Sequence, residues 1–86
     1  MVWTLVYDPT AAKELSKLDK GIAREVKTYL EEVCHLEDPA VRGHSLTGPW
    51  AGFHRYQLGQ ARVIVKIQRS VITISVVKIG RRDSVY

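Results

Sequence analysis

The strongest constraint on the fold lies in the second half of the chain, where three strand-like segments follow one another with short turns. The segments cover about residues 52–58, 61–69 and 71–79. Leu58-Gly59-Gln60-Ala61 fits a two-residue hairpin loop, because such loops place a glycine at a central position that needs positive φ. The first two segments are therefore expected to form an antiparallel pair with a defined register.

Alternation along these two strands assigns their side chains to two faces. The apolar face, expected to pack on helices, carries Tyr56, Leu58, Ala61, Val63, Val65 and Ile67. The other face carries Phe53, Arg55, Gln57, Arg62, Ile64 and Lys66. The register puts Gln57 opposite Arg62 and Arg55 opposite Ile64, so the two arginines are diagonal neighbours, roughly 7–8 Å apart at the backbone. His54 falls on the apolar side, where a structural role is expected.

The first half of the chain predicts a strand and two helices. Residues 2–7 are aromatic and β-branched, as in a strand. Asp8 offers an N-cap and Pro9 a first helical residue, giving a short helix to about Leu18 that Lys20-Gly21 is expected to break. A second helix is expected over about residues 22–36. Its apolar stripe consists of Ile22, Val26, Tyr29, Leu30 and Val33.

These elements define an α+β fold of order β-α-α-β-β-β. We expect a small twisted antiparallel sheet covered on one face by an N-terminal helical hairpin, in a single domain over residues 1–86. Residues 39–50 contain two prolines and two glycines and are expected to form a loop with Leu46 as its buried anchor. The last strand is apolar on both faces, so it is either central in the sheet or covered on its second side.

Charge is divided between the two halves of the chain. Residues 1–50 hold six basic and eight acidic side chains, whereas residues 51–86 hold seven basic side chains and one acid. The basic residues of the second half are Arg55, Arg62, Lys66, Arg69, Lys78, Arg81 and Arg82. Such a surface commonly binds a phosphate backbone, although a domain can also be basic without a nucleic-acid partner.

Several functional classes find no support in the sequence. Cys34 is the single cysteine, which excludes a disulfide framework and indicates a buried, reduced thiol in a cytoplasmic protein. His35, His44 and His54 lack metal-ligand spacing, so no metal is expected. No apolar run is long enough to span a membrane, and no glycine-rich phosphate loop or nucleophile elbow indicates a cofactor or an acyl-transfer site.

The C-terminal tail adds groups suited to phosphodiester chemistry. Arg81 and Arg82 follow the last strand, and Tyr86 ends the chain. Arginine grips phosphate oxygens with two donors and stabilises the charge of a phosphoryl transition state. A tyrosine can stack on a base or transfer a proton. Arg62, Arg82 and Tyr86 together could bind a phosphodiester and assist proton transfer; alternatively, Tyr86 is a C-terminal anchor on the core.

Four motifs in the expected order resemble the RelE/ParE superfamily of bacterial toxins from type II toxin–antitoxin pairs. Residues 7–18 are similar to its first strand and helix, with A-x-K-E-L-x-K-L, and residues 46–48 to its L-x-G. Residues 53–64 resemble W-R-Y-R-x-G-x-Y-R-V-I, and residues 80–86 resemble G-H-R-x-x-V-Y. The resemblance spans essentially the whole chain.

For RelE-type members the resemblance implies a metal-independent, ribosome-dependent endoribonuclease. It cuts mRNA in the A site when the ribose 2′-hydroxyl attacks the adjacent phosphate, and so inhibits translation. By position, Arg62 and Arg82 would stabilise the transition state, Arg82 would also protonate the leaving oxygen, and Tyr86 would stack on a base and assist the attack. Arg55 would bind phosphate or help to activate the 2′-hydroxyl. The expected RNA-binding positions are Arg81, Lys66 and Gln57.

The same resemblance implies partners. These are a cognate RelB-like antitoxin, the ribosome and mRNA, with operator DNA reached only through the antitoxin complex and no membrane. Three residues depart from the family pattern: Gln57 replaces a second basic residue, Ala61 replaces an aromatic one, and Tyr86 is the terminal residue. ParE-type members share the fold but inhibit DNA gyrase without nuclease activity, which is the alternative function. A third alternative is a nucleic-acid-binding module without activity.

Overall fold

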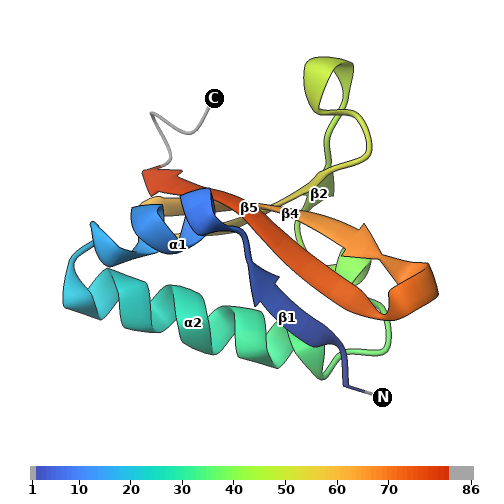
Figure 1. Ribbon diagram of the computed structural model, residues 1–86, viewed down its shortest axis with the longest axis horizontal. Helices are drawn as coiled ribbons and strands as arrows, with labels where there is room; N and C mark the ends of the chain where they lie inside the picture. The colour runs from blue at the N-terminus through green and yellow to red at the C-terminus, as the bar shows by residue number, and fades with distance from the viewer. Residues whose placement is uncertain (1, 82–86) are drawn as a thin grey trace.

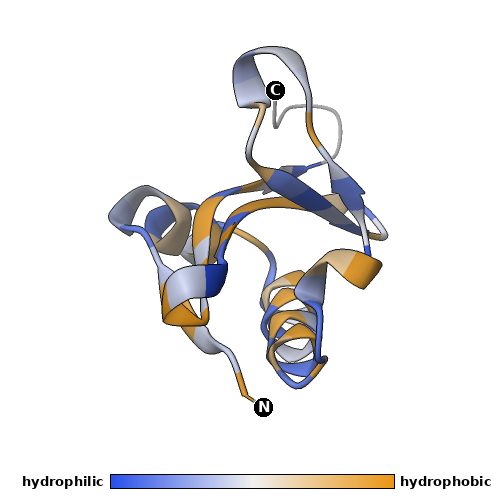
Figure 2. Cartoon of the chain, turned by 90° about the vertical axis from the view of Figure 1, so that its right-hand side faces the viewer, coloured by the Kyte–Doolittle hydropathy of each residue, from blue (hydrophilic) through white to orange (hydrophobic). Residues whose placement is uncertain are grey.

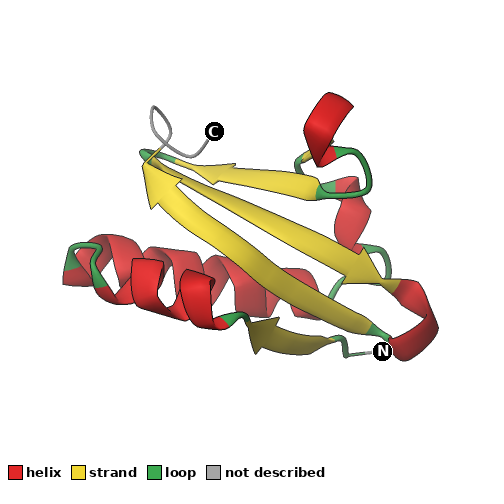
Figure 3. Cartoon of the chain, turned by 45° about the horizontal axis from the view of Figure 1, so that its top comes forward, coloured by secondary structure: helices red, strands yellow, loops and turns green. Residues whose placement is uncertain are grey.

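The computed structural model describes residues 2–81, which form two α-helices and one sheet of five strands (Figure 1). The elements are β1 (Thr4–Tyr7), α1 (Pro9–Ser16), α2 (Lys20–Cys34), β2 (His44–Ser45), β3 (His54–Leu58), β4 (Ala61–Gln68) and β5 (Thr73–Arg81). The strand order across the sheet is β1-β5-β4-β3-β2. Both helices lie against the same side of the sheet, as Figure 3 shows, so the predicted α+β arrangement with a one-sided helical cover is confirmed.

The predicted register of the β3–β4 hairpin is confirmed. Arg55 pairs with Ile64, Gln57 with Arg62 and Leu58 with Ala61. Gly59 adopts positive φ, as the two-residue turn requires. Because side chains alternate along a strand, this register alone separates the basic residues of the hairpin from its apolar ones.

The sheet is mixed, whereas the sequence predicted an antiparallel one. β1 runs parallel to β5, with Thr4 opposite Thr73 and Tyr7 opposite Val76. β4 lies antiparallel on the other side of β5. Strand β5 is therefore central over this stretch, which explains its apolar residues on both faces. The two helices form the connection that allows a parallel neighbour, because a parallel pair needs a long crossover.

The predicted loop over residues 39–50 contains a two-residue strand, β2, at the edge of the sheet. His44 pairs with Arg55 and Ser45 with His54. Gly43 has positive φ, and a Cβ at this position would clash with the carbonyl oxygen of Arg55. A glycine there therefore lets the chain approach β3 closely. Leu46, expected to be buried, is only partly buried.

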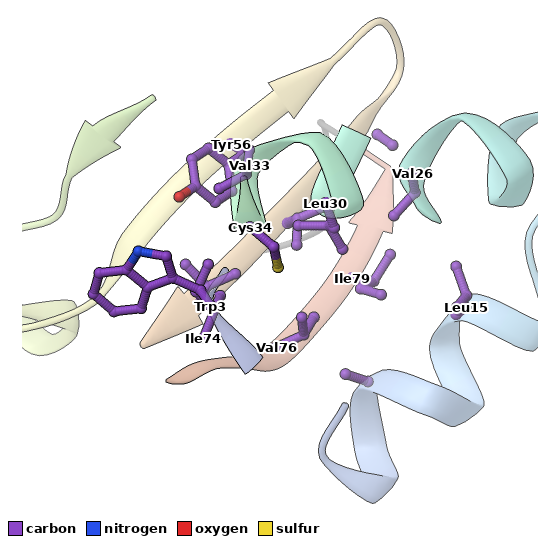
Figure 4. Packing of buried hydrophobic residues seen from close by; sticks show 14 residues of the cluster. Trp3, Leu15, Val26, Leu30, Val33, Cys34, Tyr56, Ile74, Val76 and Ile79 are labelled. Carbon is purple, nitrogen blue, oxygen red and sulfur yellow. The ribbon is translucent and has the colours of Figure 1, made fainter. Parts of the chain in front are cut away.

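The helices begin and end close to the predicted positions, with one difference. The sequence predicted that Lys20-Gly21 ends the first helix. In the structure α1 already ends at Ser16, and Lys20 and Gly21 form the first turn of α2. The predicted stripe of α2 faces the sheet: Val26, Leu30 and Val33 are fully buried. They pack with residues of β3 and β5, seen in Figure 4, including Tyr56, Ile74, Val76 and Ile79.

Buried polar contacts attach the segment between α2 and β2 to the core. The Tyr56 hydroxyl donates to the Pro39 carbonyl oxygen at 2.7 Å, and burial raises the pKa of this tyrosine well above its usual value. His54 is buried on the helical side, as expected, and hydrogen-bonds to the Arg42 carbonyl oxygen. Asp38 accepts from the Ala40 N–H and from Arg69, and these bonds lower its pKa. These bonds determine where β2 meets β3.

Two expectations, a buried cysteine and the absence of a membrane-spanning helix, can be compared with the described residues. Cys34 is buried, and this burial raises the pKa of its thiol; the nearby Glu31 carboxylate raises it further. Within residues 2–81, neither helix is long and apolar enough to cross a membrane. Figure 2 shows the apolar sides of the helices turned inward, beneath the sheet.

Candidate nucleic-acid interface

The face of the sheet that points away from the helices, here called the open face, gathers basic side chains from neighbouring strands. Arg55 on β3 lies diagonally between Arg62 and Lys66 on β4, because it pairs with Ile64. Diagonal neighbours in a sheet lie roughly 7–8 Å apart at the backbone, within reach of long side chains. Gln57, opposite Arg62, completes the predicted set on these two strands. The structure thus brings Arg55, Arg62, Lys66 and Gln57 together.

Ile64 supports this cluster from below. Its side chain is completely buried although it lies on the open face. Its direct cross-strand neighbours are Arg55 on one side and Lys78 on the other. The Nε atoms of Arg55 and Arg62 are also shielded from solvent. Partial burial of this kind limits the rotamers open to the two arginines, which favours defined positions for their guanidinium groups.

The remaining predicted site residues divide into two groups. Arg81 pairs with Ala61, a core-facing position, so alternation puts it on the helical side of the sheet and apart from Arg55 and Arg62. Its Nη2 donates to the Gln60 side chain at 3.3 Å. Arg82 and Tyr86 lie outside the described residues. Their roles therefore remain predictions from the sequence.

The structure adds two charged or titratable residues that the sequence analysis did not assign to this face. His44, exposed on β2, lies directly opposite Arg55. Lys78 on β5 pairs with Ile64, and its Nζ lies 3.3 Å from Glu14 Oε2. β2 has only two residues and no periodic signal, so its pairing was not visible in the sequence. For Lys78, the β4–β5 register contains a shift at Ile64/Val65 that a simple alternation misses.

Glu14 of α1 closes the exposed edge of β5 beyond the reach of β1. Its Oε1 accepts the Ile79 backbone N–H at 2.9 Å, and its Oε2 approaches the Lys78 ammonium. The unpaired backbone of an edge strand is thereby satisfied by a side chain. Glu14 also forms an ion pair with Lys78, next to the open face.

The chemistry available on the open face is electrostatic. Arg55 and Arg62 offer multidentate donors for phosphate oxygens, and Lys66 adds a point charge. His44 adds an exposed imidazole opposite Arg55. Among residues 2–81, no group of histidine, cysteine and acidic side chains is arranged to hold a metal ion.

Comparisons with known proteins agree with this architecture. The profile described as "ParE toxin of type II toxin-antitoxin system, parDE" matches residues 5–86. No relative was found among curated proteins.

Solved toxin structures have the same fold. A chain of the Mycobacterium tuberculosis toxin–antitoxin complex RelBE2 superposes with a TM-score of 0.86 at 22% identity, over 95% of this chain and 93% of that one. An Escherichia coli RelE mutant in complex with an antitoxin RelBc peptide gives 0.78 at 25% identity, over 94% and 84%. The Pyrococcus horikoshii RelE–RelB complex gives 0.78 at 21% identity, over 98% and 99%.

The profile match covers nearly all of the chain, and the fold agrees with it from β1 to β5. The chain belongs to the ParE toxin family of type II toxin–antitoxin systems.

Proposed function

We propose that this toxin is an endoribonuclease that cleaves mRNA in the A site of the ribosome and so inhibits translation. The observation that carries the proposal is the cluster of Arg55, Arg62 and Lys66 on the solvent-facing side of the sheet. A phosphodiester laid across this face meets donors from two strands at once. The similarity in fold to RelE proteins is a second line of support.

The proposed reaction needs only the RNA's own nucleophile. The ribose 2′-hydroxyl attacks the adjacent phosphorus and passes its proton to a general base, for which Tyr86 and a water molecule are the candidates. The bond from phosphorus to the 5′-oxygen breaks, and the leaving oxygen takes up a proton from Arg82. The products are a 2′,3′-cyclic phosphate and a 5′-hydroxyl. Arg62 and Arg82 neutralise charge that develops on the phosphoryl oxygens, Arg55 holds phosphate near the 2′-hydroxyl, and Tyr86 stacks on a base and assists the attack.

The alternative is inhibition of DNA gyrase through protein–protein contact, with no chemistry by the toxin. The observation that favours it is the family profile itself, which is that of ParE. The basic cluster supports the nuclease, because Arg55, Arg62 and Lys66 offer several donors for phosphate oxygens on one face.

Two assays on one protein preparation separate these functions. Purified toxin is added to ribosomes stalled on a defined mRNA, and the 5′ ends of the products are mapped. The same preparation is added to gyrase, and supercoiling of a relaxed plasmid is followed. We expect cuts inside the translated frame and normal supercoiling. Intact mRNA with loss of supercoiling would establish the gyrase function, and no effect in either assay would leave a binding module without activity.

A cognate antitoxin of the RelB type is the proposed protein partner, with operator DNA bound only through the complex. The toxin is proposed to work in the cytoplasm, where mRNA is translated. A cleft of about 370 Å³ beside α2 offers an apolar docking site next to the basic strands. Its lining residues are Arg24, Glu25, Thr28, Tyr29, Glu32 and Leu58.

A further inference from the structure

The loop that joins β2 to β3 carries an aromatic pair at the rim of the open face. The ring centroids of Trp50 and Phe53 lie 5.4 Å apart, with an interplanar angle of 83°. Both side chains are partly exposed. In Figures 1 and 3 this loop projects from the β2 edge of the sheet and away from the two helices, so it stands at the rim of the open face.

The loop is held by its own backbone hydrogen bonds. Leu46 N–H donates to the Phe53 carbonyl oxygen at 3.0 Å, which extends the β2–β3 pairing by one step, and Phe53 N–H donates to the Trp50 carbonyl oxygen at 3.0 Å. One turn of 3₁₀ helix, Gly48–Trp50, contains Pro49, and Gly48 and Gly52 adopt positive φ. Such a loop presents Trp50 in a defined position at low entropic cost, because a tryptophan has only two side-chain torsions.

The position of the pair relative to the basic cluster follows from the register. Phe53 lies two residues before Arg55, so alternation puts both on the open face. Continuing the β3–β4 register by one step places Phe53 opposite Lys66. Four residues separate Phe53 from Gln57, the partner of Arg62, which corresponds to roughly 13 Å along the strand. An aromatic platform and a phosphate-binding cluster thus lie in line on one surface.

We propose that Trp50, supported by Phe53, stacks on an unpaired base of single-stranded RNA whose backbone runs over Lys66, Arg55 and Arg62. This inference rests on the proposed function and adds a base-binding site to it. The combination of a basic track with an aromatic ring at its end favours a single strand, because a base in a duplex has no free face for stacking. Stacking on a ring tolerates any base, so Trp50 contributes affinity and positioning with little sequence preference.

The test compares two ligands of equal charge. One is a short single-stranded oligoribonucleotide with 2′-O-methyl groups, which block cleavage; the other is the same backbone with abasic sugars. Affinities are measured for the wild type, Trp50→Leu, Trp50→Phe and Arg62→Ala, with Val71→Ala as the control for loss of an exposed apolar side chain elsewhere. Thermal melting confirms that each variant folds, and Trp50→Phe retains a ring if Trp50→Leu does not fold.

We expect Trp50→Leu to bind the oligoribonucleotide roughly 5- to 100-fold more weakly, the range of one base–aromatic stack, and the abasic ligand as well as the wild type does. Trp50→Phe should recover most of the loss, and RNA should quench wild-type fluorescence more than that of Trp50→Phe, since Trp3 is buried. Arg62→Ala should weaken both ligands equally.

Failure of the platform and failure of the proposed function give different results. If the wild type binds both ligands with the same affinity and Trp50→Leu changes neither affinity, Trp50 does not stack on a base. Phosphate binding by the basic cluster is still supported in that case. If the wild type binds neither ligand, the open face does not bind RNA, and the proposed stacking of Trp50 is rejected together with it. If Trp50→Leu weakens only binding of a protein target such as gyrase, the loop serves the alternative function.

Discussion

Single residues on the open face are not purely surface groups. Arg55 and Arg62, the arginines that are proposed to bind phosphate, are both partly buried, and their Nε atoms are shielded from solvent. A substitution at either position therefore removes a cation and also changes a partly buried site. Stability and activity must be measured side by side for these variants.

Arg62→Ala should reduce mRNA cleavage on stalled ribosomes by roughly 10²- to 10³-fold, the usual cost of one preorganised donor to a developing oxyanion. We expect the same loss for Arg82→Ala, whose position in the chain matches a catalytic arginine of the resembling family. Arg24→Ala, which removes an exposed cation from α2, is the matched control. Either Arg62→Ala or Arg82→Ala cleaving as fast as the wild type would remove that arginine from the active site.

Two substitutions separate the two proposed roles of Tyr86, which are stacking on a base and proton transfer. Tyr86→Ala should lower the cleavage rate strongly with little change in melting temperature, because the proposed task of Tyr86 is to stack on a base and assist the attack. Tyr86→Phe keeps stacking but loses proton transfer, which is worth roughly 10²- to 10⁴-fold in rate. A Phe variant as slow as the Ala variant assigns proton transfer to Tyr86. A Phe variant near the wild type leaves that task to another group, and unfolding of Tyr86→Ala would make the tyrosine an anchor.

At the scale of elements, side chains complete what the strands leave unfinished. β1 covers β5 only from Thr73 to Val76, and Glu14 takes over at Ile79. Tyr56 in turn holds Pro39, and with it the segment that leads into β2. Strand order therefore depends on a few specific hydrogen bonds from helices and loops as well as on apolar burial.

Glu14→Ala should lower the free energy of unfolding by roughly 1.5–3 kcal/mol, as expected for loss of a charged acceptor from a partly buried backbone N–H. Glu14→Gln keeps an acceptor for Ile79 and loses only the charge opposite Lys78, so its effect should be smaller. Urea denaturation measures both, with Glu25→Ala on the exposed side of α2 as the control. Equal midpoints for Glu14→Ala and wild type would mean that the bond to Ile79 does not stabilise the fold.

Tyr56→Phe should cost about 1 kcal/mol of stability near neutral pH, because the Pro39 carbonyl oxygen loses its buried donor. Burial raises the folded-state pKa of Tyr56 above the unfolded value. Its contribution is therefore complete below about pH 10 and is lost as pH rises through the folded-state pKa. Stability of the wild type should fall more steeply above pH 10 than that of Tyr56→Phe. Parallel pH profiles in chemical denaturation would contradict this assignment.

At the scale of the whole molecule, the two helices cover one side of the sheet and leave Arg55, Arg62 and Lys66 together on the other. The charge division along the sequence thus becomes a basic cluster on the open face. A partner that supplies negative charge is complementary to this cluster, whether it is RNA or an acidic part of an antitoxin.

Antitoxin binding should weaken with salt, by at least ~10-fold in Kd between about 0.05 and 0.5 M, if the antitoxin covers the open face. Titration of the cognate antitoxin into the toxin at several salt concentrations measures the slope. Arg55→Ala should flatten it, whereas Lys27→Ala on the exposed side of α2 should not. A salt-independent Kd would place the antitoxin on the helical side, for example at the cleft beside α2.

The features that depend on local rules were predictable from the amino-acid sequence. The glycine of the Gly59-Gln60 turn and the alternation of β3 and β4 were sufficient to predict which residues pair and which basic side chains share a face. The apolar stripe of α2 likewise predicted its buried side. Both signals arise between residues that are close in the chain, where backbone geometry leaves few alternatives.

The pairings of β1 with β5 and of β2 with β3 could not be predicted from the sequence and became visible in the folded chain. The parallel contact of β1 with β5 joins segments almost seventy residues apart, and β2 is too short to show a period of its own. The bond from Glu14 to β5, the position of His44 beside Arg55 and the placement of Arg81 on the helical side depend on these pairings. The free energy that stabilises these pairings comes from packing and edge coverage in the complete sheet. No short stretch of the sequence contains the residues that make these contacts, so no local pattern predicts them.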